Sequence, residues 1–199
     1  MRSPTAPTGI AESTLLSLGV EKLLKLSVGL VALEETGVWP SNKVLGYGHS
    51  IVDLDAAVRE LMAENVSSGA QPAYSERALG ALNADTIWPL LRDGLENYGS
   101  GGRYHYLDWV TRQPQYDSPR GYWDAMERKV LAQQPDLFAL LASVAPGAFG
   151  EGRRRTNEAI VASLETWWRA VHTYWLQGAF GAAARMQSGT INPEDVFAR

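Results

Sequence analysis

Residues 14–62 read TLLSLGVEKLLKLSVGLVALEETGVWPSNKVLGYGHSIVDLDAAVRELM, and their apolar pattern decides the fold. In the first half, apolar residues recur at helical spacing and share one face: Leu16, Val20, Leu23, Leu24, Leu30 and Val31. The same spacing returns after a glycine- and proline-containing loop at Ile51, Leu54, Val58, Leu61 and Met62. Because a single amphipathic helix is marginal in water, we expect these two faces to pack against each other.

Local signals place the helix ends. Ser50, with Asp53 after it, is typical of a helix N-cap, and the first helix is predicted over residues 10–35. Ser118-Pro119 is typical of another helix start. Further helices are predicted over residues 75–82 and 85–97, capped by Ser75 and Asp85, and over residues 118–134, 136–144 and 156–187.

The segments between these helices complete one helical domain over residues 1–199. Residues 1–9 are predicted to be a flexible lead-in, and residues 67–118 a helical and loop insertion. Within that insertion, residues 99–102 are expected to be a hinge and residues 103–109 an ordered loop. Residues 150–155 contain three arginines and are predicted to be a basic surface turn, with a phosphate-contacting patch as the alternative. The sequence thus predicts an all-α bundle of four to six helices with a loop-rich middle.

The last helix has a strongly aromatic face, formed by Ile160, Leu164, Trp167, Trp168, Val171, Tyr174 and Trp175. Such a stripe fills a protein core or an oligomer interface more often than it binds a cofactor. We therefore predict that it packs against the opening helices.

Composition limits the functions that the chain can have. No cysteine is present among the 199 residues, which excludes disulfides and thiolate chemistry and favours the cytoplasm. Neither a signal peptide nor a membrane-spanning segment is predicted. The net charge of −4 argues against a broad electrostatic grip on nucleic acid, so any RNA contact is expected to be local.

The best candidate for a catalytic site is a polar strip on the last helix, where Glu165, Arg169 and His172 follow one another at offsets of four and three. A histidine near an arginine can act as general base or acid while the guanidinium stabilises charge on a phosphate. A surface ion pair beside a core-edge histidine is the alternative. A metal site from His49, His105 and His172 is disfavoured because no HExxH pair is present, and no cofactor motif is found.

The run Val20-Glu21-Lys22-Leu23-Leu24-Lys25, followed by Gly48-His49-Ser50-Ile51, resembles the opening helical pair of the HEPN superfamily, in particular abortive-infection V-like proteins. The resemblance covers about the first third of the chain. It implies an all-α bundle, homodimerisation and a role in antiviral defence, toxin systems or RNA processing. Active members are metal-independent ribonucleases that use an arginine and a histidine of the last core helix.

These implications lead to two hypotheses. In the first, the chain is a HEPN-like endoribonuclease, with catalytic residues His172, Arg169 and His49 and RNA-binding residues Arg103, Glu165 and Lys25. Arg169 and His172 have two residues between them instead of four to six, so a catalytically degenerate relative is the other form of this hypothesis. In the second, the chain is a non-catalytic module that dimerises through its tryptophan-rich last helix and regulates a protein partner.

Overall fold

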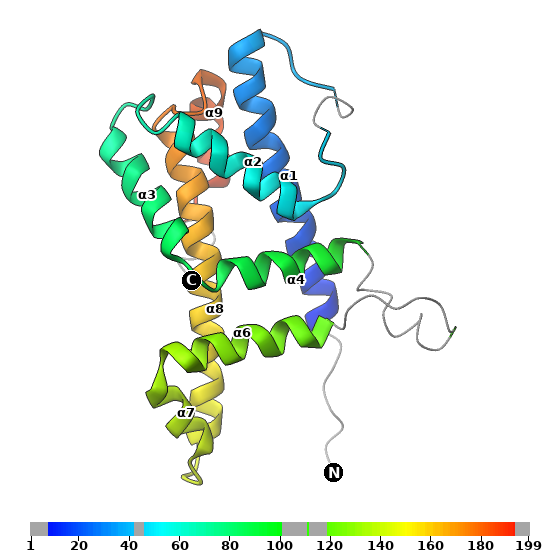
Figure 1. Cartoon of the computed structure of the whole chain (residues 1–199), viewed down its shortest axis with the longest axis vertical. Helices are drawn as coiled ribbons and strands as arrows, with labels where there is room; N and C mark the ends of the chain where they lie inside the picture. Colours follow the sequence, from blue (N-terminus) through cyan, green and yellow to red (C-terminus); the bar gives the residue numbers. More distant parts are fainter. Residues whose placement is uncertain (1–7, 42–45, 101–110, 112–118, 194–199) are drawn as a thin grey trace.

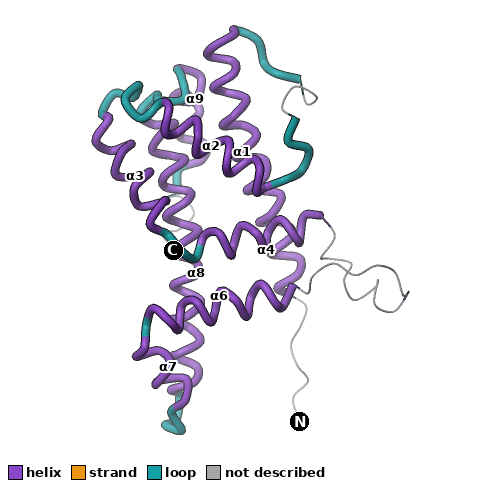
Figure 2. Tube along the Cα trace, in the orientation of Figure 1, coloured by secondary structure: helices purple, strands orange, loops and turns teal. Residues whose placement is uncertain are grey.

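The computed structural model describes residues 8–41, 46–100, 111 and 119–193, and the part that it describes is all-helical, as predicted (Figures 1 and 2). It contains eight α-helices, more than the four to six expected, and no strand. The elements in chain order are α1 (Thr8–Thr36), α2 (Ile51–Glu64), α3 (Pro72–Ala84), α4 (Trp88–Ser100), α6 (Pro119–Gln133), α7 (Pro135–Ala142), α8 (Ala148–Leu176), α9 (Ala182–Gln187) and the 3-10 turn η2 (Ser188–Ile191). Among these helices, none is long and apolar enough to cross a bilayer.

Two long helices, α1 and α8, organise the bundle. Figure 1 shows α4 crossing both of them and α6 crossing α8 next to α4, with α3 alongside α8 and α2 packed on α1. The N-terminal half of α8 extends away from the rest of the bundle and is accompanied by α7. The fold therefore has a packed upper part and a projecting α7–α8 hairpin.

The predicted faces of α1, α2 and α8 form one core. Leu24, Leu54 and Val171 are fully buried, and Trp175 of α8 donates a hydrogen bond from Nε1 to Ser27 Oγ of α1 at 3.0 Å. The prediction that the opening helices pack against the aromatic closing helix is confirmed. Because Trp167 and Trp175 are each at most 2% exposed within one chain, their face is used in the core and is not available for dimerisation.

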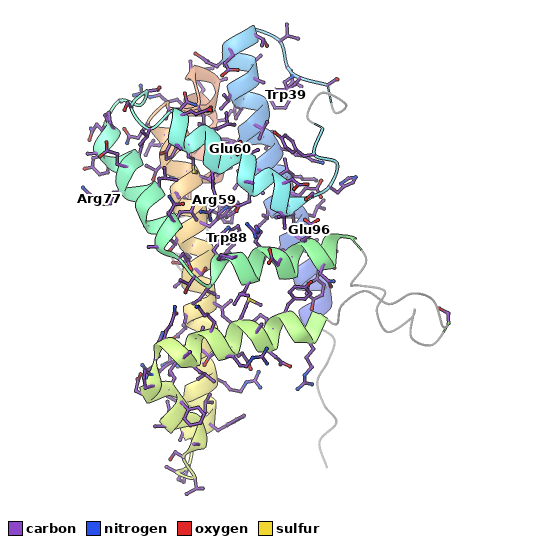
Figure 3. All side chains as sticks on the ribbon, in the orientation of Figure 1. Trp39, Arg59, Glu60, Arg77, Trp88 and Glu96 are labelled. Atoms are coloured by element: carbon purple, nitrogen blue, oxygen red, sulfur yellow. The ribbon has the colours of Figure 1, made fainter. Side chains whose placement is uncertain are left out.

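A buried carboxylate joins α2, α4 and α8. Asp55 is 1% exposed and accepts hydrogen bonds from Trp88 Nε1 at 3.2 Å and Trp167 Nε1 at 3.1 Å. The two indole rings stack with centroids 4.6 Å apart. Arg59 Nε and Arg92 Nη1 complete the Asp55 cluster at 3.0 and 3.4 Å from Oδ2. Figure 3 labels Arg59 and Trp88 in this region between α2 and α4.

The partners of Asp55 explain why a carboxylate can be buried at this position. A buried carboxylate is tolerated only when charged and hydrogen-bonding partners replace the water it has lost. For Arg92, burial alone would lower the pKa, but Asp93 and Asp55 raise it more, so that the pKa lies above its ordinary value. The Arg92 guanidinium therefore stays charged beside Asp55, and the cluster joins α2, α4 and α8.

Two local predictions about helix starts were wrong. Residues 150–155 are not a turn, because α8 begins at Ala148 and runs through them. Gly152 lies where α7 crosses α8, and a Cβ at this position would meet the Leu141 side chain at 2.7 Å, so the glycine permits the crossing. Ser75 does not cap α3, because that helix begins at Pro72, a residue preorganised for the first helical position, and Ser75 is buried inside it.

Several predicted helix ends differ from the observed ones. The predicted hinge begins inside α4, which continues through Gly99 to Ser100, and α1 begins at Thr8, inside the predicted lead-in. The predicted last helix ends at Leu176, and α9 follows a turn. Asp85 does cap α4, since its Oδ1 accepts from the amides of Ile87 at 2.8 Å and Trp88 at 3.1 Å.

Candidate functional site

Three residues from the segments 20–25 and 48–51 meet beside α1. Lys25 Nζ and His49 Nδ1 lie 2.7 and 2.9 Å from the same oxygen, Glu21 Oε1. Glu21 is 9% exposed, whereas the His49 side chain is 85% exposed. We call Glu21, Lys25 and His49 the Glu21–His49 site. It consists of a buried carboxylate that holds an exposed imidazole.

The charge of Glu21 fixes the proton position on His49. Burial alone would raise the pKa of the Glu21 carboxyl, but the hydrogen bonds and charges of Lys25 and His49 outweigh burial and hold the pKa below its ordinary value. An ionised carboxylate only accepts hydrogen bonds, so His49 donates through Nδ1–H. In the neutral imidazole, Nε2 is then the proton acceptor, as in sites where a carboxylate orients a catalytic histidine.

The backbone around His49 is fixed by α2 and α4. Ser50 caps α2 as predicted, its Oγ accepting from Asp53 N at 3.1 Å. Glu96 Oε2 of α4 accepts from Val52 N at 3.2 Å and also from Ile51 N. Glu96 is labelled in Figure 3, at the end of α4 near the start of α2. These bonds satisfy the first free amides of α2 and so anchor the helix start that directly follows His49 and Ser50.

A small pocket opens next to His49. Its volume is about 270 Å³, and its lining comprises Thr14, Ser17, Leu18, Glu21, His49 and Gly99. Ser17 Oγ donates to the Leu95 carbonyl at 2.8 Å, which joins the α1 and α4 walls. A Cβ on Gly99 would lie 2.7 Å from Ser17 Oγ, so a glycine allows α4 to approach α1 at this point.

The other predicted site residues lie elsewhere. Glu165, Arg169 and His172 are on α8, with Arg169 exposed and Glu165 and His172 half-buried. Their neighbour Trp168 donates from Nε1 to the Ile191 carbonyl of η2 at 2.8 Å, which places this side of α8 against the C-terminal elements. The pocket beside His49 has no lining residue from α8 among those described. Arg103 lies outside the described residues.

The Glu21–His49 site has the components for proton transfer. The exposed imidazole can remove or deliver a proton, and Lys25 provides a positive charge next to it. In the described ranges, no group of three His, Asp or Glu side chains is arranged to hold a metal ion.

Sequence reasoning selected Lys25 and His49 but missed Glu21, which joins them. The sequence does carry a signal, because Glu21 and Lys25 stand four residues apart, the spacing at which an acidic and a basic side chain pair on a helix. Comparisons with protein family models, curated proteins and solved structures gave no match for this chain.

Proposed function

We propose that the chain is a HEPN-like protein of RNA-directed defence or stress response in the cytoplasm, and that it cleaves single-stranded RNA without a metal at the Glu21–His49 site. One observation carries the proposal: the two motifs on which the resemblance rests meet at this site. Glu21 and Lys25 come from the first motif and His49 from the second, 28 residues after Glu21, and their side chains share one carboxylate oxygen beside a pocket.

The proposed chemistry uses His49 as the general base. Its Nε2 takes the proton of a ribose 2′-hydroxyl, and the resulting oxygen attacks the adjacent phosphorus. The bond from phosphorus to the 5′-oxygen breaks, and that oxygen takes a proton from water, leaving a 2′,3′-cyclic phosphate and a 5′-hydroxyl. Glu21 stabilises the imidazolium that forms, and Lys25 offsets negative charge on the phosphate.

The test is cleavage of a fluorescent single-stranded RNA in EDTA. His49→Ala is expected to lower the rate by about 100-fold or more, since general base catalysis contributes on that order. Lys25→Ala should lower it as well, whereas the matched control Lys22→Ala, which removes an exposed lysine of the same helix, should not.

The same assay decides between the two predicted locations of the chemistry. If His172→Ala and Arg169→Ala abolish cleavage while His49→Ala leaves it unchanged, the active site is on α8 and the present assignment is wrong. If the wild-type protein does not cleave RNA in EDTA, the catalytic proposal fails as a whole.

A second candidate, a protein-interaction module, is favoured by one surface feature. Phe138 of α7, Val144 of the α7–α8 connection and Phe149 of the first turn of α8 are 65%, 101% and 59% exposed. We call them the α7–α8 tip. Clustered exposed aromatic and aliphatic side chains mark interaction surfaces more often than isolated ones do.

Light scattering tests this candidate. The double variant Phe138→Ser and Phe149→Ser should convert a homodimer into a monomer if the tip is a self-association surface. A control change at Val161, which is also exposed on α8 but outside the tip, should leave the mass unchanged.

A further inference from the structure

The pocket beside His49 also restricts what kind of group it can bind. We infer that this pocket binds one nucleobase that bears an exocyclic amino group, while the RNA backbone remains outside it. The bases of this kind are adenine, cytosine and guanine, and the inference rests on the proposed function. Size gives the first argument. Sites for drug-sized ligands occupy about 300–1,000 Å³, and this pocket, at about 270 Å³, is suited to a single ring system.

Charge gives the second argument. Glu21 lies in the wall of the pocket, is nearly buried and has a lowered pKa, so it presents a negative charge at neutral pH. A phosphate inside the pocket would be repelled by this carboxylate. The exposed His49 ring lines the pocket, and Lys25 Nζ lies 2.7 Å from Glu21 Oε1, so the phosphate is expected beside these two side chains and the base inside.

The hydrogen-bonding capacity of Glu21 gives the third argument. Its Oε1 accepts from both Lys25 and His49, whereas Oε2 has no hydrogen-bond partner among the residues that the structure describes. A carboxylate oxygen can only accept, so the group that it recognises must be a donor. Adenine, cytosine and guanine each carry an exocyclic amino donor. The base-edge donor of uracil, N3–H, lies between two carbonyl oxygens, which the negative carboxylate repels.

The walls of the pocket are fixed before any ligand binds. Ser17 Oγ joins α1 to the Leu95 carbonyl of α4, and Glu96 joins α4 to the start of α2. Thr14 and Ser17 add hydroxyl groups to the lining and Leu18 an apolar surface. A preorganised site loses less entropy on binding, so the difference between bases should appear in affinity.

The experiment measures fluorescence anisotropy of heptanucleotides in EDTA, at low temperature, with 2′-O-methyl groups that prevent cleavage. Heptauridine is compared with heptamers that carry adenine, cytosine or guanine at the central position. The amino-bearing heptamers should bind roughly tenfold tighter than heptauridine, since a hydrogen bond to a charged acceptor has about that effect.

Two variants locate the preference. Glu21→Gln should reduce the difference among the four heptamers to about twofold or less. Leu18→Trp, which fills the pocket and leaves Glu21 in place, should have the same effect, and circular dichroism checks that each variant is folded. The exposed residue Leu26 of the same helix provides a control, Leu26→Trp, that should keep the preference.

Equal affinity for all four heptamers, or a preference that survives in both Glu21→Gln and Leu18→Trp, would overturn the inference. The proposed function fails differently. If unmodified heptauridine is cleaved at the same rate as the others and His49→Ala stops that cleavage, the base preference is wrong and the catalytic assignment stands.

Discussion

Replacement of Asp55 should be the most destabilising single change to a polar side chain in the described part of the fold. Its carboxylate is 1% exposed and accepts from two indole N–H groups and two arginines that belong to α2, α4 and α8. Asp55→Ala leaves these donors facing a cavity without an acceptor. Removing one partner of a buried charged cluster costs about 3–5 kcal/mol.

Urea unfolding at pH 7 followed by circular dichroism measures this loss. At a slope of about 2 kcal/mol per molar urea, the midpoint should fall by about 1.5–2.5 M. Asp55→Asn keeps one acceptor oxygen and should lose less. The matched control Glu60→Gln removes a charge from the exposed side of the same helix, where a change within about 0.5 kcal/mol is expected. A loss below about 1 kcal/mol for Asp55→Ala would refute the argument that this carboxylate holds three helices together.

Three further predictions concern single side chains. Tyr174→Phe should leave the stability in thermal unfolding unchanged or raise it by about 1 kcal/mol, because the buried Tyr174 hydroxyl has no hydrogen-bond partner in the described part of the chain. Burial is also the main reason that the pKa of this hydroxyl is raised to about 12. Trp167→Ala should cost about 3–5 kcal/mol in urea unfolding, and Trp168→Ala, at a half-buried position, clearly less; equal losses would contradict the burial pattern. The pKa of Glu21 is lowered in the folded state, so its stabilising effect is complete above the ordinary value of 4.5 and is lost as the pH falls through the folded-state pKa. The stability difference between the wild type and Glu21→Gln should therefore shrink below about pH 4.5. A constant difference down to pH 3 would contradict this.

The fold was largely predictable because its signals are local. Helical periodicity marked the buried faces of α1, α2 and α8, and the Ser50 cap depends on residues only three apart. The start of α8 was missed because glycine and arginine at residues 150–155 have a turn-like composition, whereas the contact between Gly152 and Leu141 of α7 is tertiary. A tertiary contact of this kind cannot be predicted from amino-acid composition alone.

The polar interior was predictable only in part. Asp55 stands four residues after Ile51 and three before Val58, on the apolar stripe of α2, and an acidic residue there signals a buried carboxylate in need of donors. Which donors it has depends on Trp88 and Trp167, which are 33 and 112 residues away in sequence. Likewise, Glu21 and Lys25 stand four residues apart in the sequence, but the contact of His49 with Glu21 depends on tertiary structure, 28 residues further along the chain.

The position of bound RNA tests the central claim most directly. A single-stranded RNA containing 4-thiouridine is crosslinked to the protein by near-ultraviolet light, and the modified peptides are identified by mass spectrometry. Crosslinks in residues 14–25 and 46–52, lost when Glu21 and His49 are replaced, are the predicted result. Crosslinks confined to α8 or to the α7–α8 tip, or unaffected by those replacements, would contradict the assignment of the site.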